Sequence, residues 1–395
     1  MQGEGHYARV FDVAFSPEDS SLLASASDDD TCKVWRTSEA GATQAASFHG
    51  HSDSVLRVSW APAGNLLASA SADTTVRVWQ IEGSDVDPAL PRFGAEELLC
   101  LEGHPEEVYA CEFLDTSTGS MRLASCSEDK VYLWDIATGC QLDSAGPPLD
   151  IRHEPAGYDI PDRWQDGHIF SLVTQPDSGS ILAGCCSDGA LRTWAREGAS
   201  LEPLCAVRLR NAMGSSCAWH PDGFHVALTF TSGDVAVVDI RTWSVVWEAS
   251  QRCPTFGCCY LPGNSNTLAV CGPANCVSVF DTSADDRKRA EQMLLEAPSI
   301  PERHLLCISA SADGSAIAAS GNTVNTPGSK ADDDPTPSRT AKGEADNDGL
   351  FSSSGFLETF GKGAQMPDVE QIGAEHKQAA KQSKWSPVTL WRKAP

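Results

Sequence analysis

The sequence is poor in basic residues. Its 395 residues include 29 lysines and arginines against 54 aspartates and glutamates, which gives a formal net charge of −25. Because phosphate groups are bound through lysine and arginine, this deficit argues against nucleic acid or an anionic membrane as the main partner. It is compatible with basic protein partners.

Long apolar runs and a secretion signal are also missing. The apolar runs fall far below the ~18 residues of a membrane helix, so we expect no membrane insertion. Many of the 15 cysteines lie in apolar, strand-like runs, such as Cys185–Cys186 and Cys258–Cys259. A secreted protein would pair them, so we expect a reducing compartment, cytoplasmic or nuclear, with the cilium as an alternative.

Recognisable catalytic motifs are absent as well. The sequence contains no GxSxG, P-loop, HExxH or dinucleotide-binding fingerprint. We therefore expect no enzymatic activity and no cofactor.

What the sequence does contain is a repeat. Residues 22–35 read LLASASDDDTCKVW, and residues 66–79 read LLASASADTTVRVW. The second copy holds three strand-like runs, Val55–Trp60, Leu66–Ser71 and Thr75–Trp79, separated by turn residues. Short strands that recur about every 40 residues without helical periodicity indicate the blades of a β-propeller.

These copies resemble the WD40 family, whose signature combines Gly-His, a small-residue strand, an Asp in a turn and a Trp. The resemblance implies a buried, hydrogen-bonded tetrad of His, Ser or Thr, Asp and Trp in each blade, which supplies the partners that a buried carboxylate needs. The implied tetrads are His6, Ser25, Asp29 and Trp35 in the first copy, His51, Ser69, Asp73 and Trp79 in the second, and His104, Ser125, Asp129 and Trp134 in the third. The third copy has a turn one residue shorter.

The later copies depart from this pattern. In the fourth copy, Gln165 falls on the His position and Gly184 replaces the Ser, while Asp188 and Trp194 remain. Residues 217–239 keep the turn and the strands without a tetrad.

The last copies are shorter still. In residues 258–281, Phe280 stands at the Trp position, and residues 305–320 contain only two strands of a seventh copy. The third strand of that copy is expected at residues 387–391, and a short helix that begins after Ser283 is expected over residues 281–298.

The expected fold is all-β: a seven-bladed WD40 β-propeller with a long insertion in the last blade. Residues 1–320 would form blades 1–6 and the first half of blade 7, and residues 387–395 the last propeller strand. The insertion at 321–386 is acidic and rich in Ser and Gly, a composition that cannot bury a core. Residues 355–361 could supply the outer strand of the last blade.

The insertion also contains a small apolar cluster. Two interpretations stay open: the cluster folds back on the propeller, or it binds a partner as a linear motif. Its members are Phe351, Phe356, Leu357 and Phe360.

The resemblance further implies a binding surface on the top face of the propeller. In WD40 proteins this face carries the residues three and five places after the tetrad His and the residue before the turn Asp. The candidates are Arg9, Phe11, Asp28, Leu56, Glu107, Tyr109, Glu128, His168, Phe170, Phe256, His304 and Leu306. Aromatic and acidic residues together favour a protein partner with basic and apolar residues. The alternative is that these side chains tuck against the neighbouring blade.

We therefore expect a non-catalytic, monomeric WD40 scaffold that mediates protein–protein interactions within a multiprotein complex. One alternative is a substrate receptor of a cullin-type ubiquitin ligase, suggested by Asp234, Asp239 and Arg241, although Val238 stands where that pattern has an aromatic residue. Another alternative is a reader of histone tails or other basic peptides.

A group of cysteines lies close together in the sixth copy. These residues could be zinc ligands or small apolar fillers of the core. We expect fillers and no metal site. The residues are Cys253, Cys258, Cys259, Cys271 and Cys276.

Overall fold

The structure is a computed structural model. It describes residues 5–38, 41–82, 94–114, 121–153, 167–176, 178–251, 253–262, 266–272, 276–283, 293–296, 303–323 and 388–392. The regular structure in these ranges consists of strands, and they contain no helix long and apolar enough to cross a membrane.

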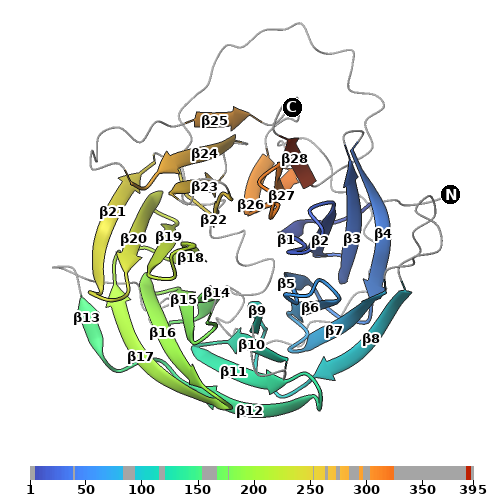
Figure 1. Ribbon diagram of the computed structural model, residues 1–395, viewed down its shortest axis with the longest axis horizontal. Coiled ribbons are helices and arrows are strands. Elements are labelled where there is room, and N and C mark those ends of the chain that lie inside the picture. The colour runs from blue at the N-terminus through green and yellow to red at the C-terminus, as the bar shows by residue number, and fades with distance from the viewer. Residues whose placement is uncertain are drawn as a thin grey trace, which may run out of the picture. The chain divides into compact units, whose positions relative to one another are not determined.

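The described strands form seven sheets, numbered here in chain order (Figure 1). Sheet 1 contains β1 (Val10–Phe15), β2 (Leu22–Ser27), β3 (Thr31–Ser38) and β4 (Gly41–His49). Sheet 2 contains β5 (Val55–Trp60), β6 (Leu66–Ser71), β7 (Val76–Glu82) and β8 (Gly94–Leu101). Sheet 3 contains β9 (Ala110–Leu114), β10 (Arg122–Ser127), β11 (Lys130–Asp135) and β12 (Cys140–Ala145). Sheet 4 contains β13 (Ile151–His153), β14 (Ile169–Thr174), β15 (Ile181–Cys186), β16 (Ala190–Glu197) and β17 (Ser200–Arg208).

The remaining sheets follow the same order. Sheet 5 contains β18 (Gly214–Trp219), β19 (His225–Phe230), β20 (Asp234–Asp239) and β21 (Ser244–Ser250). Sheet 6 contains β22 (Gly257–Tyr260), β23 (Thr267–Cys271), β24 (Cys276–Asp281) and β25 (Met293–Glu296). Sheet 7 contains β26 (Arg303–Ala310), β27 (Ala316–Thr323) and β28 (Val388–Arg392).

Within the unit of residues 1–323 and 387–395, the sheets surround a common axis with β1, β5, β9, β14, β18, β22 and β26 innermost (Figure 1). The all-β propeller is therefore confirmed. Six sheets have four or five strands and are complete blades, whereas sheet 7 has three described strands.

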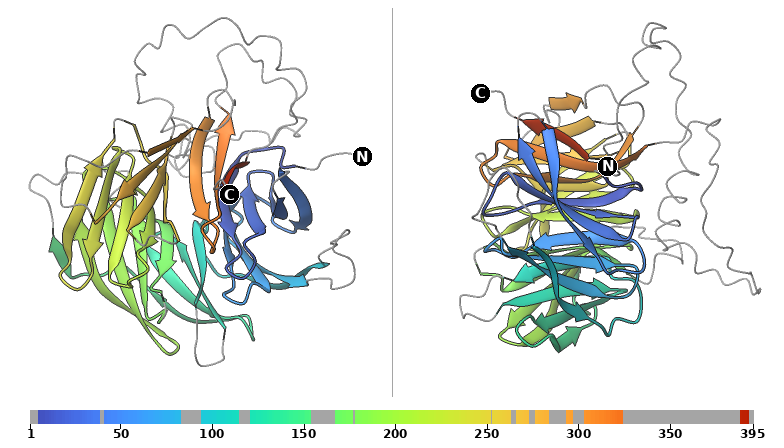
Figure 2. Two further views of the ribbon diagram at one scale, coloured as in Figure 1. Left: turned by 45° about the horizontal axis from the view of Figure 1, so that its top comes forward. Right: turned by 90° about the vertical axis from the view of Figure 1, so that its right-hand side faces the viewer.

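The apolar cores lie between the sheets. Each buried cluster draws its residues from two neighbouring sheets, which stand face to face in the views of Figure 2. The second strands β2 and β6, both LLASAS, are buried over their whole length. Because both faces of such a strand are covered, small residues there leave room for the large side chains of the adjoining sheet.

Sheets 1 and 7 close the ring by direct packing. Ala316 and Ala318 of β27 share a buried cluster with Val10, Val13 and Phe15 of β1. The Phe15 amide donates to Ser309 Oγ at 3.1 Å. Among the described strands, sheet 7 has no outer strand, and the residues expected to supply one, 355–361, lie outside the described ranges, as does the apolar cluster of the insertion.

Two segments differ from the sequence expectations, and a third forms a strand for which no expectation was stated. The helix expected over 281–298 is wrong for Met293–Glu296, which form β25 and pair with β24. The insertion was expected to begin at residue 321, but β27 continues to Thr323. Ile151–His153 form β13, which pairs in parallel with β17 and widens sheet 4. In Met293–Glu296, pairing with the neighbouring strand β24 outweighs a weak local preference for helix.

Candidate functional site

A hydrogen-bonded tetrad lies within each of the first two blades. His6 Nε2 lies 2.7 Å from Ser25 Oγ, and His6 Nδ1 lies 2.9 Å from Asp29 Oδ2. Trp35 Nε1 donates to the same Ser25 Oγ at 2.8 Å. Because Ser25 accepts from Trp35, its hydroxyl hydrogen is free to donate to His6 Nε2, which leaves the His6 proton on Nδ1, facing Asp29.

The charge of the first tetrad resides on its carboxylate. Burial lowers the pKa of His6, so this ring is neutral near pH 7. Burial would raise the pKa of Asp29, but hydrogen bonds from His6, Thr31 and the Tyr7 amide outweigh it and hold the pKa at about 2. The second blade repeats the geometry with distances of 2.7–2.8 Å among His51, Ser69, Asp73 and Trp79.

One end of the propeller gathers the residues predicted to bind a partner. This end, called the rim here, carries the turns between second and third strands and the loops that enter the next innermost strand. Backbone bonds join these two kinds of segment: the Val108 amide donates to the Ser71 carbonyl at 3.0 Å, and the Ile169 amide donates to the Glu128 carbonyl at 2.8 Å.

The candidate binding residues separate into two groups. Phe170, Phe256 and Leu306 are only 9%, 6% and 8% exposed, so the tucked alternative applies to these three. Phe170 packs edge-on against Tyr109, with 5.2 Å between ring centroids. The side chain of His304 lies outside the described residues. The partly exposed candidates are Arg9, Phe11, Asp28, Leu56, Glu107, Tyr109, Glu128 and His168.

The rim carries one exposed aromatic residue that is not among the predicted binding residues. Tyr7 is 81% exposed, and its hydroxyl donates to the Asp29 carbonyl at 3.4 Å. Tyr7 directly follows the tetrad histidine His6 in the chain, and this position could have indicated from the sequence that it lies on the rim.

Carboxylates crowd the rim of blades 1–3. Burial raises the pKa of Asp30, and the neighbouring charges of Asp53 and Asp28 raise it further. Burial raises the pKa of Glu107 to about 7, aided by Asp53 and Glu106 and opposed by a hydrogen bond from Tyr109. Neighbouring carboxylates disfavour each other's ionised form, so a cation that binds among these residues is stabilised.

Comparison with known proteins identifies the repeat. The family model described as "WD domain, G-beta repeat" matches residues 2–36, 42–80 and 95–135. The chain carries WD40 repeats. The matched ranges coincide with the blades in which the His–Ser–Trp bonds are formed.

Several WD40-type relatives share parts of the chain. It is 26% identical over 246 residues to a guanine nucleotide-binding protein subunit beta of Oryza sativa subsp. japonica, which covers 60% of this chain and 57% of that protein. It is 46% identical over 65 residues to the protein transport protein sec13 of Aspergillus oryzae, and the match covers 16% of this chain and 22% of that protein. It is 22% identical over 196 residues to a WD repeat-containing protein 26 homolog of Arabidopsis thaliana, and the match covers 49% of this chain and 29% of that protein. The chain thus spans less than two thirds of each relative's length.

The third WD40 tetrad is incomplete. His104 Nε2 and Trp134 Nε1 each lie 2.8 Å from Ser125 Oγ, but the buried His104 Nδ1 makes no hydrogen bond to Asp129. The expected role of Asp129 is therefore wrong. In blades 1 and 2 a residue with positive φ follows the tetrad Asp, whereas here Glu128, with φ of 54°, precedes Asp129. The shorter turn thus displaces the carboxylate from the histidine.

The isolated His104 makes a testable contribution to pH-dependent stability. Burial lowers its pKa to about 4, opposed in part by the Thr74 carbonyl. The unfolded chain, with an ordinary pKa of 6.5, binds more protons between these values, so His104 stabilises fully above pH 6.5 and progressively less as the pH falls to about 4. Relative to His104→Gln, we expect the wild type to lose about 3 kcal/mol of unfolding free energy over this range.

Urea unfolding of both proteins at several pH values measures this difference. The comparison with His104→Gln is needed because the partly buried Glu107 and Glu112, with pKa values raised to about 7, act in the opposite direction in both proteins. Parallel stability curves for the two proteins would contradict the prediction.

The fourth WD40 copy contains a buried ion pair. Arg192 donates from both terminal nitrogens to Asp188, at 2.8 and 2.5 Å, and both side chains are buried. Trp194 donates to the Gly146 carbonyl at 2.7 Å instead of to a serine. A Cβ at Gly184 would lie 3.0 Å from the Trp194 ring, so this ring occupies the space of the missing serine. In the described part of this copy, Asp188 thus pairs with Arg192 and Trp194 with the Gly146 carbonyl. Gln165, at the predicted His position, lies outside the described residues, so the tetrad roles of Asp188 and Trp194 stay predictions.

A second charge network lies in the innermost strands. Asp12 of β1 accepts the Val58 amide at 2.9 Å and lies 3.5 Å from Arg57 Nε. Glu112 of β9 accepts from Ser59 Oγ at 3.1 Å. The network thus bridges the inner edges of blades 1–3, and no sequence motif indicated it.

The blade 6 cysteines behave as protonated thiols. Burial raises the pKa of Cys258 well above its ordinary value and that of Cys259 to about 12, and a thiol must lose its proton to bind metal. Among the described residues, no group of three ligands includes a cysteine. The side chain of Cys276 lies outside these residues.

The residues of the suggested cullin pattern are engaged within blade 5. Arg241 donates to Asp239 at 2.7 Å and stacks over the Phe224 ring at 4.5 Å. Asp234 lies at the opposite end of β20, and Val238 is buried. Asp239 and Arg241 thus have partners within blade 5, and these contacts account for both residues without a ubiquitin-ligase subunit bound to them. The substrate-receptor function stays a prediction.

Proposed function

We propose that this chain is a non-catalytic scaffold with a ring of seven blades, sheet 7 being the last, and that its rim binds a basic segment of another protein. The supporting observation is the crowding of carboxylates at blades 1–3, beside the exposed Tyr7 and the partly exposed Phe11 and Tyr109. Interaction scaffolding agrees with the WD40 repeats and the WD-repeat relatives. A cytoplasmic or nuclear complex is the proposed setting.

Charge reversal on the rim tests this function. Asp53 and Glu106 are exposed, so replacing both with lysine changes the rim without disturbing a core. We expect Asp53→Lys/Glu106→Lys to weaken the binding of a synthetic Lys- and Arg-rich peptide about tenfold, because attraction becomes repulsion. Fluorescence anisotropy at two salt concentrations measures the affinity, which should fall with added salt.

A matched variant controls for net charge. Glu18→Lys/Glu202→Lys makes the same change at exposed positions outside the rim, and it should bind nearly as the wild type does. If both variants weaken peptide binding equally, the loss of affinity comes from the change in net charge, and the rim is not the binding site. A pull-down with both variants then identifies the natural partners that depend on the rim.

A further inference from the structure

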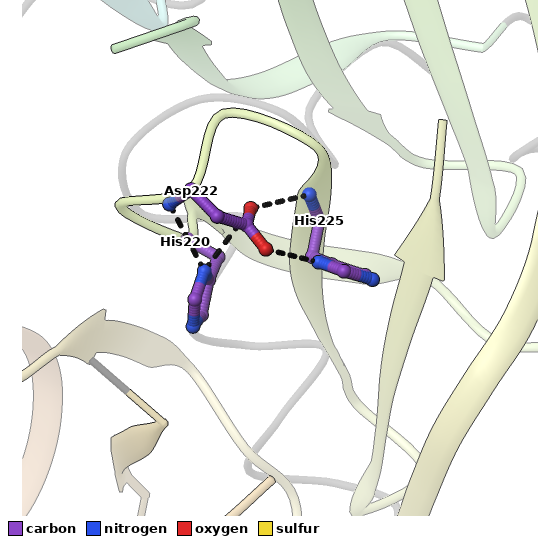
Figure 3. A group of neighbouring side chains, drawn as sticks. All are labelled: His220, Asp222 and His225. Carbon is purple, nitrogen blue, oxygen red and sulfur yellow. Dashed lines mark hydrogen bonds and ion pairs between the residues drawn. The ribbon is translucent and has the colours of Figure 1, made fainter. Parts of the chain in front are cut away.

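Two histidines and an aspartate converge in the turn between β18 and β19 (Figure 3). The ligand atoms of His220, Asp222 and His225 all lie within 4.8 Å of one another. His220 Nδ1 is 3.1 Å from Asp222 Oδ1, and His225 Nδ1 is 2.6 Å from Asp222 Oδ2. This turn joins a first to a second strand and therefore lies at the end of the sheet opposite the rim.

The ring of His220 is oriented with its Nδ1 toward Asp222 within the turn. Its Nδ1 accepts the Asp222 amide at 3.1 Å, so this nitrogen carries no proton. Its Nε2 lies 3.3 Å from Asn266 Oδ1, a suitable acceptor for the remaining ring proton. The Tyr260 ring packs edge-on against the imidazole, with centroids 4.8 Å apart. A cation bound at Nδ1 would take the place of the Asp222 amide hydrogen bond and would lie beside the Asp222 carboxylate, whose charge it would neutralise.

His225 has a carboxylate on each side. Its Nδ1 bonds to Asp222, and its Nε2 lies 3.8 Å from Oδ2 of the buried Asp239. If a metal occupies Nδ1, the ring proton can move to Nε2 and face Asp239. A carboxylate behind the outer nitrogen of a ligating histidine is the usual means of orienting such a ring and raising its basicity.

We propose that His220 Nδ1, His225 Nδ1 and the Asp222 carboxylate bind a Zn²⁺ ion, with water in the remaining coordination position. Two imidazoles and one carboxylate form a ligand set that zinc accepts. Asp222 is exposed, so the ion can enter from solvent. Asn266 and Tyr260 belong to blade 6, so binding would also tie this turn to the adjoining blade. The site departs from the sequence expectation of no metal.

Zinc titration of the full-length chain after chelator treatment tests the proposal. We expect calorimetry to show a single site that is lost in His220→Gln/His225→Gln, and Zn²⁺ to raise the melting temperature of the wild type alone. His49→Gln removes an exposed histidine of β4 and should bind as the wild type does. Asp239→Asn should weaken binding about 10- to 100-fold, because the outer carboxylate is lost.

Two further measurements keep the test decisive. Co²⁺ replaces Zn²⁺ as an absorption probe, and the spectrum should lack the intense charge-transfer band of thiolate ligation. His225→Gln alone retains a hydrogen-bonding partner for Asp222 and serves if the double variant fails to fold. Unchanged zinc affinity in the histidine variants, no binding by the folded wild type, or a thiolate band would each overturn the assignment.

Discussion

Asp188→Asn is expected to lower the free energy of unfolding by about 3–5 kcal/mol. Asp188 pairs through both oxygens with Arg192, and the two side chains are 4% and 10% exposed. Asparagine keeps the size of the side chain but removes its charge, so the guanidinium stays buried beside Cys186 without a counter-ion. The penalty arises from this stranded charge and greatly exceeds the net value of the pair.

Two controls isolate the effect of burial. Asp150 and Arg152 form an exposed pair, with side chains 48% and 54% exposed, so Asp150→Asn should cost less than about 1 kcal/mol. Asp188→Leu combined with Arg192→Met removes both charges and should be less destabilising than Asp188→Asn. Denaturant unfolding at pH 7 measures all three, and equal losses for Asp188→Asn and Asp150→Asn would refute the argument.

Trp79→Ala is expected to cost about 3–5 kcal/mol, because it opens a cavity between sheets 1 and 2. The Trp79 side chain is 2% exposed, packs against Phe48 with 5.2 Å between centroids, and donates to Ser69 Oγ at 2.8 Å. Its removal therefore leaves both an empty volume and a tetrad serine without its donor.

An exposed apolar residue of the same sheet provides the comparison. Leu98 of β8 is 43% exposed, so Leu98→Ala should change the stability by no more than about 0.5 kcal/mol. Thermal unfolding followed by near-ultraviolet circular dichroism reports on tryptophan packing in both variants. A loss below about 1 kcal/mol for Trp79→Ala would mean that the neighbouring sheets collapse into the space.

The repeat predicted the propeller because its strands and turns follow local rules. In blades 1 and 2 the turn lengths match, so His6 and His51 meet their aspartates as the resemblance implies. Asp129 was misassigned because a single deletion shifts the backbone conformation of the turn, which residue identity alone does not reveal. Asp188 found its cation four residues later on the next strand, which no tetrad pattern contains.

The surface was harder to predict than the tetrads. Phe256 and Leu306 occupy expected rim positions, but their exposure depends on how closely the neighbouring blade approaches, which is a tertiary property. The proposed zinc ligands His220, Asp222 and His225 fall within six residues. That spacing also fits an ordinary hairpin turn, so the sequence alone does not indicate a metal site there, and the proposal rests on the side-chain directions.

The closure between sheets 1 and 7 has a consequence for how the ring assembles. Sheets 1, 2, 3 and 5 are each built from one contiguous stretch of chain, so their contacts are local and their folding is fast. The bonds between Phe15 and Ser309 and between Ser320 and Phe11 span about 300 residues of chain. Among the described contacts, this seam and the pairing of β27 with β28 therefore close long stretches of chain, and the seam closes the longest. We expect blades to add in order along the nascent chain and the seam to form late.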